Sequence, residues 1–413
     1  MNKTVALIMT LDTKGAEAEY LRDKIISKGK NVIVLDGGIL GVPQKIKADI
    51  TREEIAKTAG TDLETLKAAS RGKAVEAMAE GITRIIKQLY SEGKIHGILS
   101  VGGAEGTILG TEGMKALPVG VPKVMVSTMA SGQQAFGEYT GTKDVMLMHS
   151  VIDILGINSI SQKIFDNAIA AVVGMIDENV GSVADMASDT SKKRIAATMY
   201  GNTTPAVSRA KAMLEKEGYE VIVFHSNGTG GRAMEEFVEQ GAFCGILDVT
   251  THEIADDLVG GMHSVANRLT AGPLSGLPQL VVPGCVDWAT LGALDELSPK
   301  FQGRPYYYHN RTCTLVTLSN DEIKQVGEIM AERLNKSKGP TKVAFPLRGL
   351  SAIGKEGVSD IFNPERDQLL LKTLKQNLRK DIELIEVDAH INDPEFVDTI
   401  IPIFLKLLKE GKS

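Results

Sequence analysis

Turns rich in glycine and hydroxyl residues follow four apolar runs of the sequence, at 12–14, 102–107, 128–132 and 228–232. Glycines let backbone N–H groups approach an anion closely, and a helix that follows turns its positive end toward the same anion. One such turn is ordinary turn chemistry, but several at equivalent positions predict an anionic ligand. We assign contacts with this ligand to Asp12, Thr13, Lys14, Gly102, Gly103, Gly106, Thr107, Thr128, Ala130, Ser131, Gly132, Gly230, Gly231 and Arg232.

The charged residues of these turns fit a phosphate-bearing ligand. Lys14 and Arg232 lie near glycines, although most such side chains are simply solvated; the guanidinium fork of arginine suits a phosphate. Asp12 could accept a hydrogen bond from a ribose hydroxyl or cap the helix that starts near Gly15, with capping favoured. GxxxxGK[ST] is absent, and TLDTKG replaces GxGxxG after the first run. The sequence therefore predicts neither a P-loop nor a standard dinucleotide fingerprint.

Two ionisable residues are candidates for proton transfer. Glu105, within GGAEGT, could act as a general base or a magnesium ligand, or could face solvent. His225 ends the run VIVFH, a position suited to acid–base work or to orienting a neighbour. His252 and Glu253 resemble half of a metal site, but HExxH is absent and no second ligand is visible. We therefore assign catalysis to Glu105 and His225 and assign no metal ligand.

An internal repeat places these residues on equivalent elements. VALIMTLDTK (5–14) recurs as IAATMYGNTT (195–204), HGILSVGGAEGT (96–107) as CGILDVTTHEIA (244–255), and VPKVMVSTMASG (121–132) as LPQLVVPGCVDWA (277–289). Each block is an unbroken apolar run followed by small polar residues, which is typical of a strand buried on both faces in a parallel sheet. The second copy lacks an insert of about forty residues near 39–80.

We therefore predict an α/β protein of two tandem Rossmann-like domains with parallel sheets, 1–185 and 190–413. Ligands of open parallel sheets bind past the carboxyl ends of the strands, so the two rows of turns predict a ligand cleft between the domains. The insert at 39–72 carries capping residues and is expected to form short helices over this cleft. FQGRPYYYHNRT (301–312) is interpreted as a polar loop.

Composition excludes several classes of protein. A net charge of −6 argues against nucleic acid as a partner, and no apolar run reaches membrane-spanning length. Three cysteines without CxxC spacing indicate a reduced compartment, and the N-terminal apolar run is too short for a signal peptide. We expect a cytoplasmic protein that forms a homo-oligomer, a dimer.

Long blocks in fixed order give the chain a resemblance to a known group of proteins. They include TLDTKGAE (10–17), SVGGAEGT (100–107), YTGTKDVMLMHSVIDILGIN (139–158), EGYEVIVFHSNGTGGRAME (217–235) and HINDPEFVD (390–398). Through them the chain resembles the N-terminal ATP-binding, inhibitory region of the tomato mosaic virus resistance protein. It also resembles the uncharacterised bacterial and fungal proteins built around that region.

The resemblance implies two Rossmann-like domains and an ATP site formed by the turns at 12–14, 102–107 and 128–132. ATP is thus the expected cofactor, with Mg²⁺ as its candidate companion. The antiviral role depends on a surface partner and does not carry over. Ala104 and Glu105 depart from the small glycine-rich version of this turn in the plant protein, which raises the question of what Glu105 does.

These observations favour an intracellular ATP-binding protein that acts as a small-molecule enzyme in the interdomain cleft. The density of ionisable residues at the ends of the predicted strands supports turnover. The alternative is a nucleotide-gated protein-binding module without turnover, in which ATP fixes the two domains in one orientation for a partner protein. A dehydrogenase is the poorer choice because the first turn lacks the required glycines.

Overall fold

The computed structural model describes residues 2–131, 137–178, 180–186, 189 and 191–411. The chain divides into two compact units, Met1–Asp185 and Met186–Ser413, and each is described on its own. Gly132, assigned above to the ligand, lies outside the described residues.

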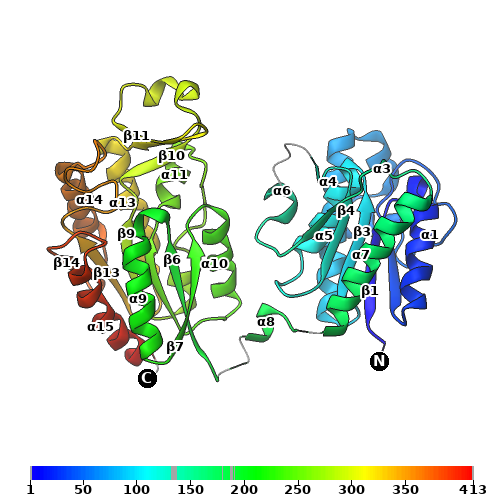
Figure 1. Cartoon of the computed structure of the whole chain (residues 1–413), viewed down its shortest axis with the longest axis horizontal. Helices are drawn as coiled ribbons and strands as arrows, with labels where there is room; N and C mark the ends of the chain where they lie inside the picture. Colours follow the sequence, from blue (N-terminus) through cyan, green and yellow to red (C-terminus); the bar gives the residue numbers. More distant parts are fainter. Residues whose placement is uncertain (1, 132–136, 179, 187–188, 190, 412–413) are drawn as a thin grey trace. The chain divides into compact units, whose positions relative to one another are not determined.

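The first unit is built on a parallel sheet of β1 (Thr4–Met9), β2 (Asn31–Asp36), β3 (Gly97–Gly102), β4 (Lys123–Ser127) and β5 (Met146–His149) (Figure 1). The strands lie in the order β2-β1-β3-β4-β5. β1, β3 and β4 are buried at every residue, because unbroken apolar runs such as TVALIM must be covered on both faces.

Helices cover both faces of this sheet. α1 (Leu11–Ser27) and α7 (Ser159–Glu178) pack on one face, and α2 (Arg52–Thr58), α4 (Arg71–Ser91) and α5 (Ala104–Lys115) pack on the other. The chain leaves β1 for one face and leaves the adjacent β3 for the opposite face. This divergence is the topological switch point at which ligands of open α/β sheets bind. The remaining short helices are α3 (Leu63–Ala68), α6 (Gly137–Thr140) and α8 (Val183–Met186).

The insert that the second copy lacks forms the short helices α2 and α3, as the sequence predicted. A capping box between Thr51 and Glu54 starts α2, and the Asp62 side chain caps α3. A Cβ atom on Gly81 of α4 would lie 2.3 Å from the carbonyl oxygen of Ile55. Glycine is therefore what lets α2 lie directly on α4.

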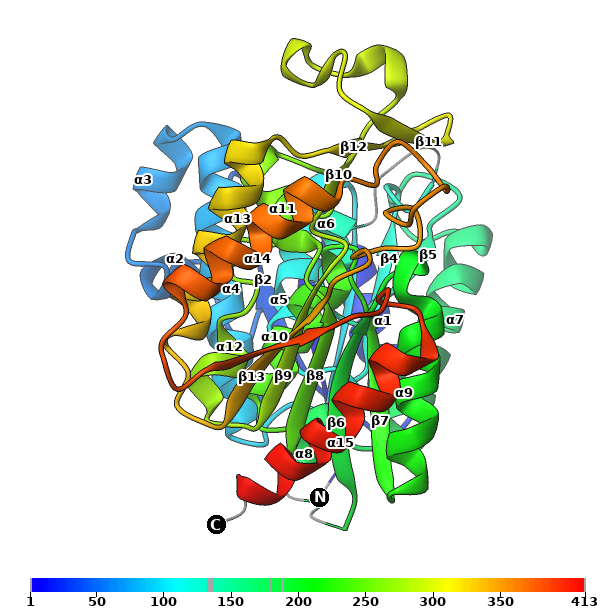
Figure 2. The same ribbon diagram turned by 90° about the vertical axis from the view of Figure 1, so that its left-hand side faces the viewer.

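The second unit repeats this plan with β6 (Lys193–Met199), β7 (Tyr219–His225), β8 (Gly245–Thr250), β9 (Gln279–Gly284), β13 (Thr341–Pro346) and β14 (Glu383–Val387). These parallel strands run side by side in the order β14-β13-β9-β8-β6-β7 (Figure 2). The segments matched in the repeat thus form equivalent strands, since β7-β6-β8-β9 has the order of β2-β1-β3-β4. Two tandem Rossmann-like domains with parallel sheets, as predicted, are confirmed.

Helices of the second unit follow the same division. α9 (Thr204–Lys216) and α15 (Pro394–Glu410) pack on one face of the sheet. α11 (Glu253–Val259), α13 (Asn320–Leu334) and α14 (Pro364–Asn377) pack on the other. The switch point of this unit therefore lies between β6 and β8. The remaining helices are α10 (Thr229–Glu239), α12 (Ala271–Ser275) and the 3₁₀ turns η1 (Gly201–Thr203), η2 (Leu294–Glu296) and η3 (Pro299–Phe301).

A small antiparallel sheet belongs to the second unit alone. It consists of β10 (Trp288–Leu291), β11 (Tyr306–Asn310) and β12 (Cys313–Thr317), in the order β10-β12-β11. The prediction of a polar loop at 301–312 was wrong for the tyrosine-rich part. Consecutive tyrosines favour the pleated conformation, and β11 pairs with β12 while its side chains stay exposed. Among the helices that the structure describes, none is long and apolar enough to cross a membrane.

Candidate functional site

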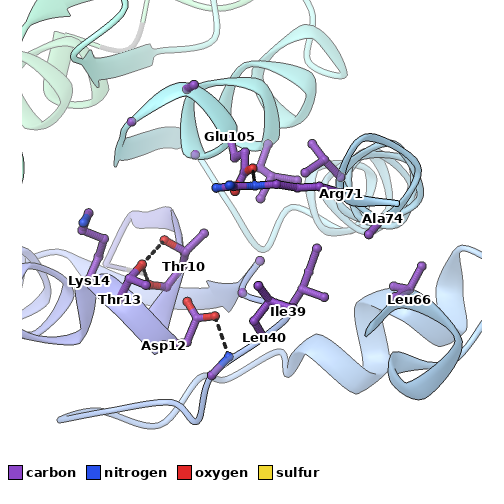
Figure 3. A pocket seen from close by; sticks show the side chains of 18 of the residues that line it. Thr10, Asp12, Thr13, Lys14, Ile39, Leu40, Leu66, Arg71, Ala74 and Glu105 are labelled. Atoms are coloured by element: carbon purple, nitrogen blue, oxygen red, sulfur yellow. Dashed lines mark hydrogen bonds and ion pairs between the residues drawn. The ribbon is translucent and has the colours of Figure 1, made fainter. Parts of the chain in front are cut away.

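A cavity of about 760 Å³ opens at the carboxyl ends of β1, β2 and β3 in the first unit (Figure 3). Its volume lies in the range usual for small-molecule sites, and its position is the switch point between β1 and β3. Thr10 and Asp12 line it from the end of β1, and Gly103 and Glu105 line it from the end of β3. We call this cavity the switch-point pocket.

The N-termini of α1 and α5 both face the switch-point pocket. Thr10 is the N-cap residue of α1 and Gly103 that of α5, and within the described residues neither makes a side-chain capping bond. The first backbone N–H groups of a helix have no partner in the helix itself, and the helix dipole adds partial positive charge there. At α1 the N–H of Leu11 already donates to Asp36 Oδ1 and the helix is interrupted at Lys14, so the start of α5 is the better set of donors for an anion.

Charged side chains of both signs line the pocket, and Lys67 also pairs with Glu64 at 2.8 Å. Among its described lining residues, Lys14, Lys67 and Arg71 are cationic and Asp12 and Glu105 are acidic. Arg71 forms an ion pair with Glu105, and this hydrogen bond raises the pKa of the Arg71 guanidinium. In Figure 3 the Arg71 side chain extends across the pocket to reach Glu105. The pairing holds Arg71 beside the N-terminus of α5.

The insert supplies the apolar wall of the pocket. Ile39, Leu40 and Leu66 come from the insert, and Ala74 and Val75 come from the first turns of α4. Leu40 is 73% exposed, an uncommon state for a leucine that borders a cavity. An apolar wall opposite anion-binding donors suits a ligand with a flat apolar part and a charged part.

A buried ion pair fixes the insert to the sheet. Arg52 is 2% exposed and donates to Asp36 Oδ2, at 2.7 Å from Nη2 and 2.8 Å from Nε. The same guanidinium donates from Nη1 to the carbonyl oxygen of Gly41, and Asp36 Oδ1 accepts from the N–H groups of Leu11 and Gly38. Asp36 therefore holds the segments around Leu11, Gly38 and Arg52 in place at the edge of the pocket.

Six of the sequence-assigned residues line the switch-point pocket: Asp12, Thr13, Lys14, Gly103, Glu105 and Gly106. Gly102 and Thr107 are not among the described lining residues and pack against other parts of the first unit. A Cβ atom on Gly102 would lie 2.7 Å from Gly106 Cα, and the buried Thr107 hydroxyl lies 2.6 Å from Ser127 Oγ. The turn after β4 contains three further assigned residues, Thr128, Ala130 and Ser131. None of them is among the described residues that line the pocket.

The other assigned turn belongs to the second unit and begins α10. A Cβ atom on Gly230 would lie 2.0 Å from the carbonyl oxygen of His225, and one on Gly231 would lie 2.2 Å from Glu253 Oε1. Both glycines are thus required by close packing. Arg232 is exposed on the same helix turn. The turn at 228–232 therefore belongs to the second unit, whereas all described lining residues of the switch-point pocket belong to the first.

Aromatic and imidazole rings fill the equivalent position in the second unit. Tyr200 follows β6 and lies 5.2 Å from His225, 5.3 Å from His252, 5.7 Å from His263 and 5.7 Å from Trp288, measured between ring centroids. His252 and Trp288 are 4.2 Å apart. We call these five residues the ring cluster. It lies beside the switch point between β6 and β8.

Burial and neighbouring charges shift the pKa values of three residues of the ring cluster. Burial raises the pKa of Tyr200 to about 12. A hydrogen bond with Thr290 acts to lower this pKa, whereas Cys313, Asp256 and Cys285 act to raise it further. Burial lowers the pKa of His263. Burial also acts to lower the pKa of His252, but Asp256, the Cys285 carbonyl and Glu253 together outweigh it, so that pKa is raised. Tyr200 is thus a neutral phenol at physiological pH.

A buried charge network links α10, β8 and α11 of the second unit. Arg268 is fully buried and pairs with Glu235, Asp248 and Glu253. Burial raises the pKa of Glu235 above its ordinary value. Asp248 also accepts a hydrogen bond from Thr198 in β6 at 2.6 Å. Asp248 therefore ties β8 to β6.

Sequence reasoning identified His225 but missed most of its neighbours. The repeat carried one usable signal, because Tyr200 occupies the position of Thr10 in the alignment of IAATMYGNTT with VALIMTLDTK. His263 and Trp288 are not related to the other ring-cluster residues by any sequence spacing typical of a site, so they could not be identified from the sequence. Arg71 and Lys67 were missed because they belong to the insert, which has no counterpart in the second copy.

The fold and these sites define a tandem α/β protein, with a pocket at one switch point and a ring cluster beside the other. Residues 3–180 match the N-terminal domain and residues 192–408 the C-terminal domain of the uncharacterised protein family UPF0261. The chain belongs to this family.

Relatives of the chain differ in length. A UPF0261 protein of Clostridium tetani is 40% identical over 413 residues, covering 99% of this chain and 100% of its own. The ToMV resistance protein Tm-1 of Solanum lycopersicum is 36% identical over 346 residues, which cover 83% of this chain but 45% of the tomato protein. The resemblance stated from the sequence is thereby confirmed. Among solved structures, UDP-N-acetylglucosamine 2-epimerase from Rickettsia bellii covers 99% of this chain and 98% of its own at 11% identity, but its TM-score of 0.23 is too low to indicate a shared function.

Proposed function

We propose that the first unit binds ATP in the switch-point pocket and that the chain is a small-molecule enzyme. The observation that carries the proposal is the N-terminus of α5, which opens on a cavity that Lys14, Lys67 and Arg71 also line. Backbone donors and cations at a switch point suit the phosphates of a nucleotide. The apolar wall from the insert suits a purine base.

The carboxylates of the pocket can contribute only in part to the binding of Mg²⁺. Asp12 Oδ2 accepts from the N–H of Gly41 at 3.1 Å, and Glu105 pairs with Arg71. Mg²⁺ usually keeps several waters and binds through phosphates plus one or two carboxylates. An ion that accompanied ATP would be held mainly by the phosphates, with support from Asp12, a carboxylate of the pocket lining.

Turnover in this proposal depends on His225 in the second unit. Its exposed imidazole ends β7, stacked on Tyr200, so one ring face is held while its nitrogens can exchange protons. Glu105 is the weaker candidate for proton transfer because Arg71 occupies its carboxylate. The alternative, a nucleotide-gated protein-binding module, predicts ATP binding without any turnover that depends on His225.

The pocket is tested by Gly103→Val. A Cβ atom at Gly103 meets Thr128 Oγ1 at 3.9 Å as its nearest neighbour in the described residues, and Gly103 has an ordinary φ of −77°. The valine therefore fits the fold but fills the space in front of the α5 N–H groups. We expect ATP affinity to fall at least tenfold, about 1.4 kcal/mol, by calorimetry.

Gly174→Val is the matched control, because Gly174 lies in α7 and its Cβ would meet no described atom within 4 Å. It should bind ATP like the wild type. Unchanged ATP affinity in a folded Gly103→Val protein would remove this turn from the site. A cytoplasmic location and a homodimer are part of the same proposal and rest on the sequence.

A further inference from the structure

Three side chains of the second unit converge beside its switch point. One ligand atom each from His252, Asp256 and His263 lies within 4.8 Å of the other two. His252 and Asp256 are four residues apart, so they lie on the same face of one helical turn. The chain then turns through Gly260, which has a φ of 78°, and Gly261, where a Cβ atom would lie 2.4 Å from Asp256 Cγ. This tight turn returns His263 to the carboxylate.

We infer that His252, Asp256 and His263 bind a divalent transition-metal ion such as Zn²⁺, at a site separate from the proposed ATP pocket. Two imidazoles and one carboxylate, with further positions open, form a ligand set found in catalytic zinc and non-haem iron sites. His252 Nε2 lies 3.4 Å from Asp256 Oδ1, and His263 Nδ1 lies 3.9 Å from Asp256 Oδ2. Ligands bound at zinc distances in a tetrahedron are about 3.4 Å apart, so the three ligand atoms, which lie within 4.8 Å of one another, would have to draw together around an ion.

The surroundings of His252 suit a metal ligand. Its Nδ1 lies 2.8 Å from the carbonyl oxygen of Cys285. This contact favours the tautomer with the proton on Nδ1 and a lone pair on Nε2, which is the usual outer-shell arrangement of a ligating histidine. Nε2 lies 2.8 Å from the Thr290 hydroxyl, the group that an ion would displace. Cys285 itself has a φ of 60°, a strained conformation of the kind that gathers at functional sites.

Backbone N–H groups hold the Asp256 carboxylate in place. Oδ1 accepts from the N–H of Thr290 at 2.7 Å, and Oδ2 accepts from the N–H of His263 at 2.8 Å. A carboxylate has about four lone-pair sites, so each oxygen keeps one for an ion. The rings of Trp288 and Tyr200, 4.2 Å and 5.3 Å from the His252 ring, form an apolar shell that limits water.

His263 supplies the most direct sign of a missing partner. Its Nδ1 is buried and has no hydrogen-bond partner among the described residues. Leaving such an atom unpaired costs about 1–3 kcal/mol, and the nearest acceptor on Asp256 is too distant for a hydrogen bond. A metal ion between His263 and Asp256 would satisfy both groups.

The test uses the full-length protein made without a histidine tag and stripped with a chelator. Calorimetric titration with Zn²⁺ should give one tight site per chain in the wild type and in His309→Ala, whose histidine is exposed on β11. His263→Ala should weaken Zn²⁺ binding by more than about 100-fold, because losing a ligand exceeds the 10–100-fold cost of losing an outer-shell partner.

Thermal unfolding provides a second readout. Zn²⁺ should raise the melting temperature of the wild type as binding to the native state predicts, and should leave that of His263→Ala unchanged. A cooperative transition of His263→Ala without Zn²⁺ would establish that this variant is folded. The inference is overturned if the wild type takes up no stoichiometric Zn²⁺, if folded His263→Ala binds it like the wild type, or if His309→Ala loses it equally.

Discussion

Tyr200 and His225 stack with their ring centroids 5.2 Å apart and an angle of 1° between their planes. Tyr200 directly follows β6 and His225 ends the adjacent β7, where Met199 and His225 pair in register. Offset or parallel ring contacts add about 0.5–1.5 kcal/mol beyond the area they bury. The phenol therefore positions the imidazole without hydrogen bonding to its nitrogens, which stay available for proton transfer.

His225→Ala should lower turnover by on the order of 10²-fold if His225 acts as a general acid or base. ATP affinity should not change, because His225 is not among the described residues that line the switch-point pocket. Untargeted metabolite profiling of purified protein with ATP, Mg²⁺ and a cell extract provides the measurement. His309→Ala is the control and should deplete the same compound as the wild type.

Two outcomes of that profiling would change the assignment. Depletion that survives in His225→Ala would exclude His225 from the reaction. The absence of any depletion by the wild type, with ATP still bound, would favour the nucleotide-gated module.

Arg52→Met should damage the pocket without touching the ligand. Removing one partner of a buried ion pair costs about 3–5 kcal/mol because the other charge is left uncompensated, and Arg52 and Asp36 are 2% and 1% exposed. We expect faster hydrogen exchange of the α2 amides and weaker ATP binding by calorimetry. Arg22→Met is the control, since Arg22 pairs with Asp23 at the surface. Normal exchange in α2 of Arg52→Met would mean that the insert is held by other contacts.

Asp367 predicts a pH dependence of stability in the second unit. Burial, with a contribution from Asp287, raises the pKa of Asp367 from 3.8 to about 8. A carboxyl group whose pKa is higher in the folded state binds its proton more tightly there, so the folded state is favoured at low pH. This contribution is fully present below pH 3.8 and is lost as the pH rises to about 8, with a slope of at most about 1.4 kcal/mol per pH unit.

Asp367→Asn should remove that part of the pH dependence and raise the free energy of unfolding at pH 8 and above. Urea denaturation followed by fluorescence reports on the second unit alone, because the chain has a single tryptophan, Trp288. Asp360→Asn, an exposed residue of the same unit, should behave like the wild type. Parallel pH profiles for Asp367→Asn and the wild type would contradict the raised pKa.

Local sequence patterns predicted the sheets and the turns well. Apolar runs such as TVALIM and GILSVG became fully buried parallel strands, because a strand covered on both faces has a distinctive sequence. Asp12 and Gly103 were found for a similar reason, since the residues that follow adjacent parallel strands must meet at one edge of the sheet.

Contacts between segments that share no periodic sequence pattern could not be predicted from the sequence. Arg52 reaches Asp36 from an insert with no counterpart in the repeat. His263 joins His252 only because a glycine turn reverses the chain behind α11. Glu105 was interpreted as a general base because its partner Arg71, 34 residues away, could not be identified from spacing.

The insert at 39–72 has a consequence for how the two copies diverged. Both copies have the same strand order, so an ancestral half would have offered the same site twice. The first copy has a wall, with Leu40 and Leu66 bordering an open cavity, whereas in the second copy the rings of Tyr200 and Trp288 lie at the equivalent place. Under the proposed function, duplication allowed ligand binding by the first copy and chemical reactivity of the second to be selected separately, so that mutations improving one half need not have compromised the other.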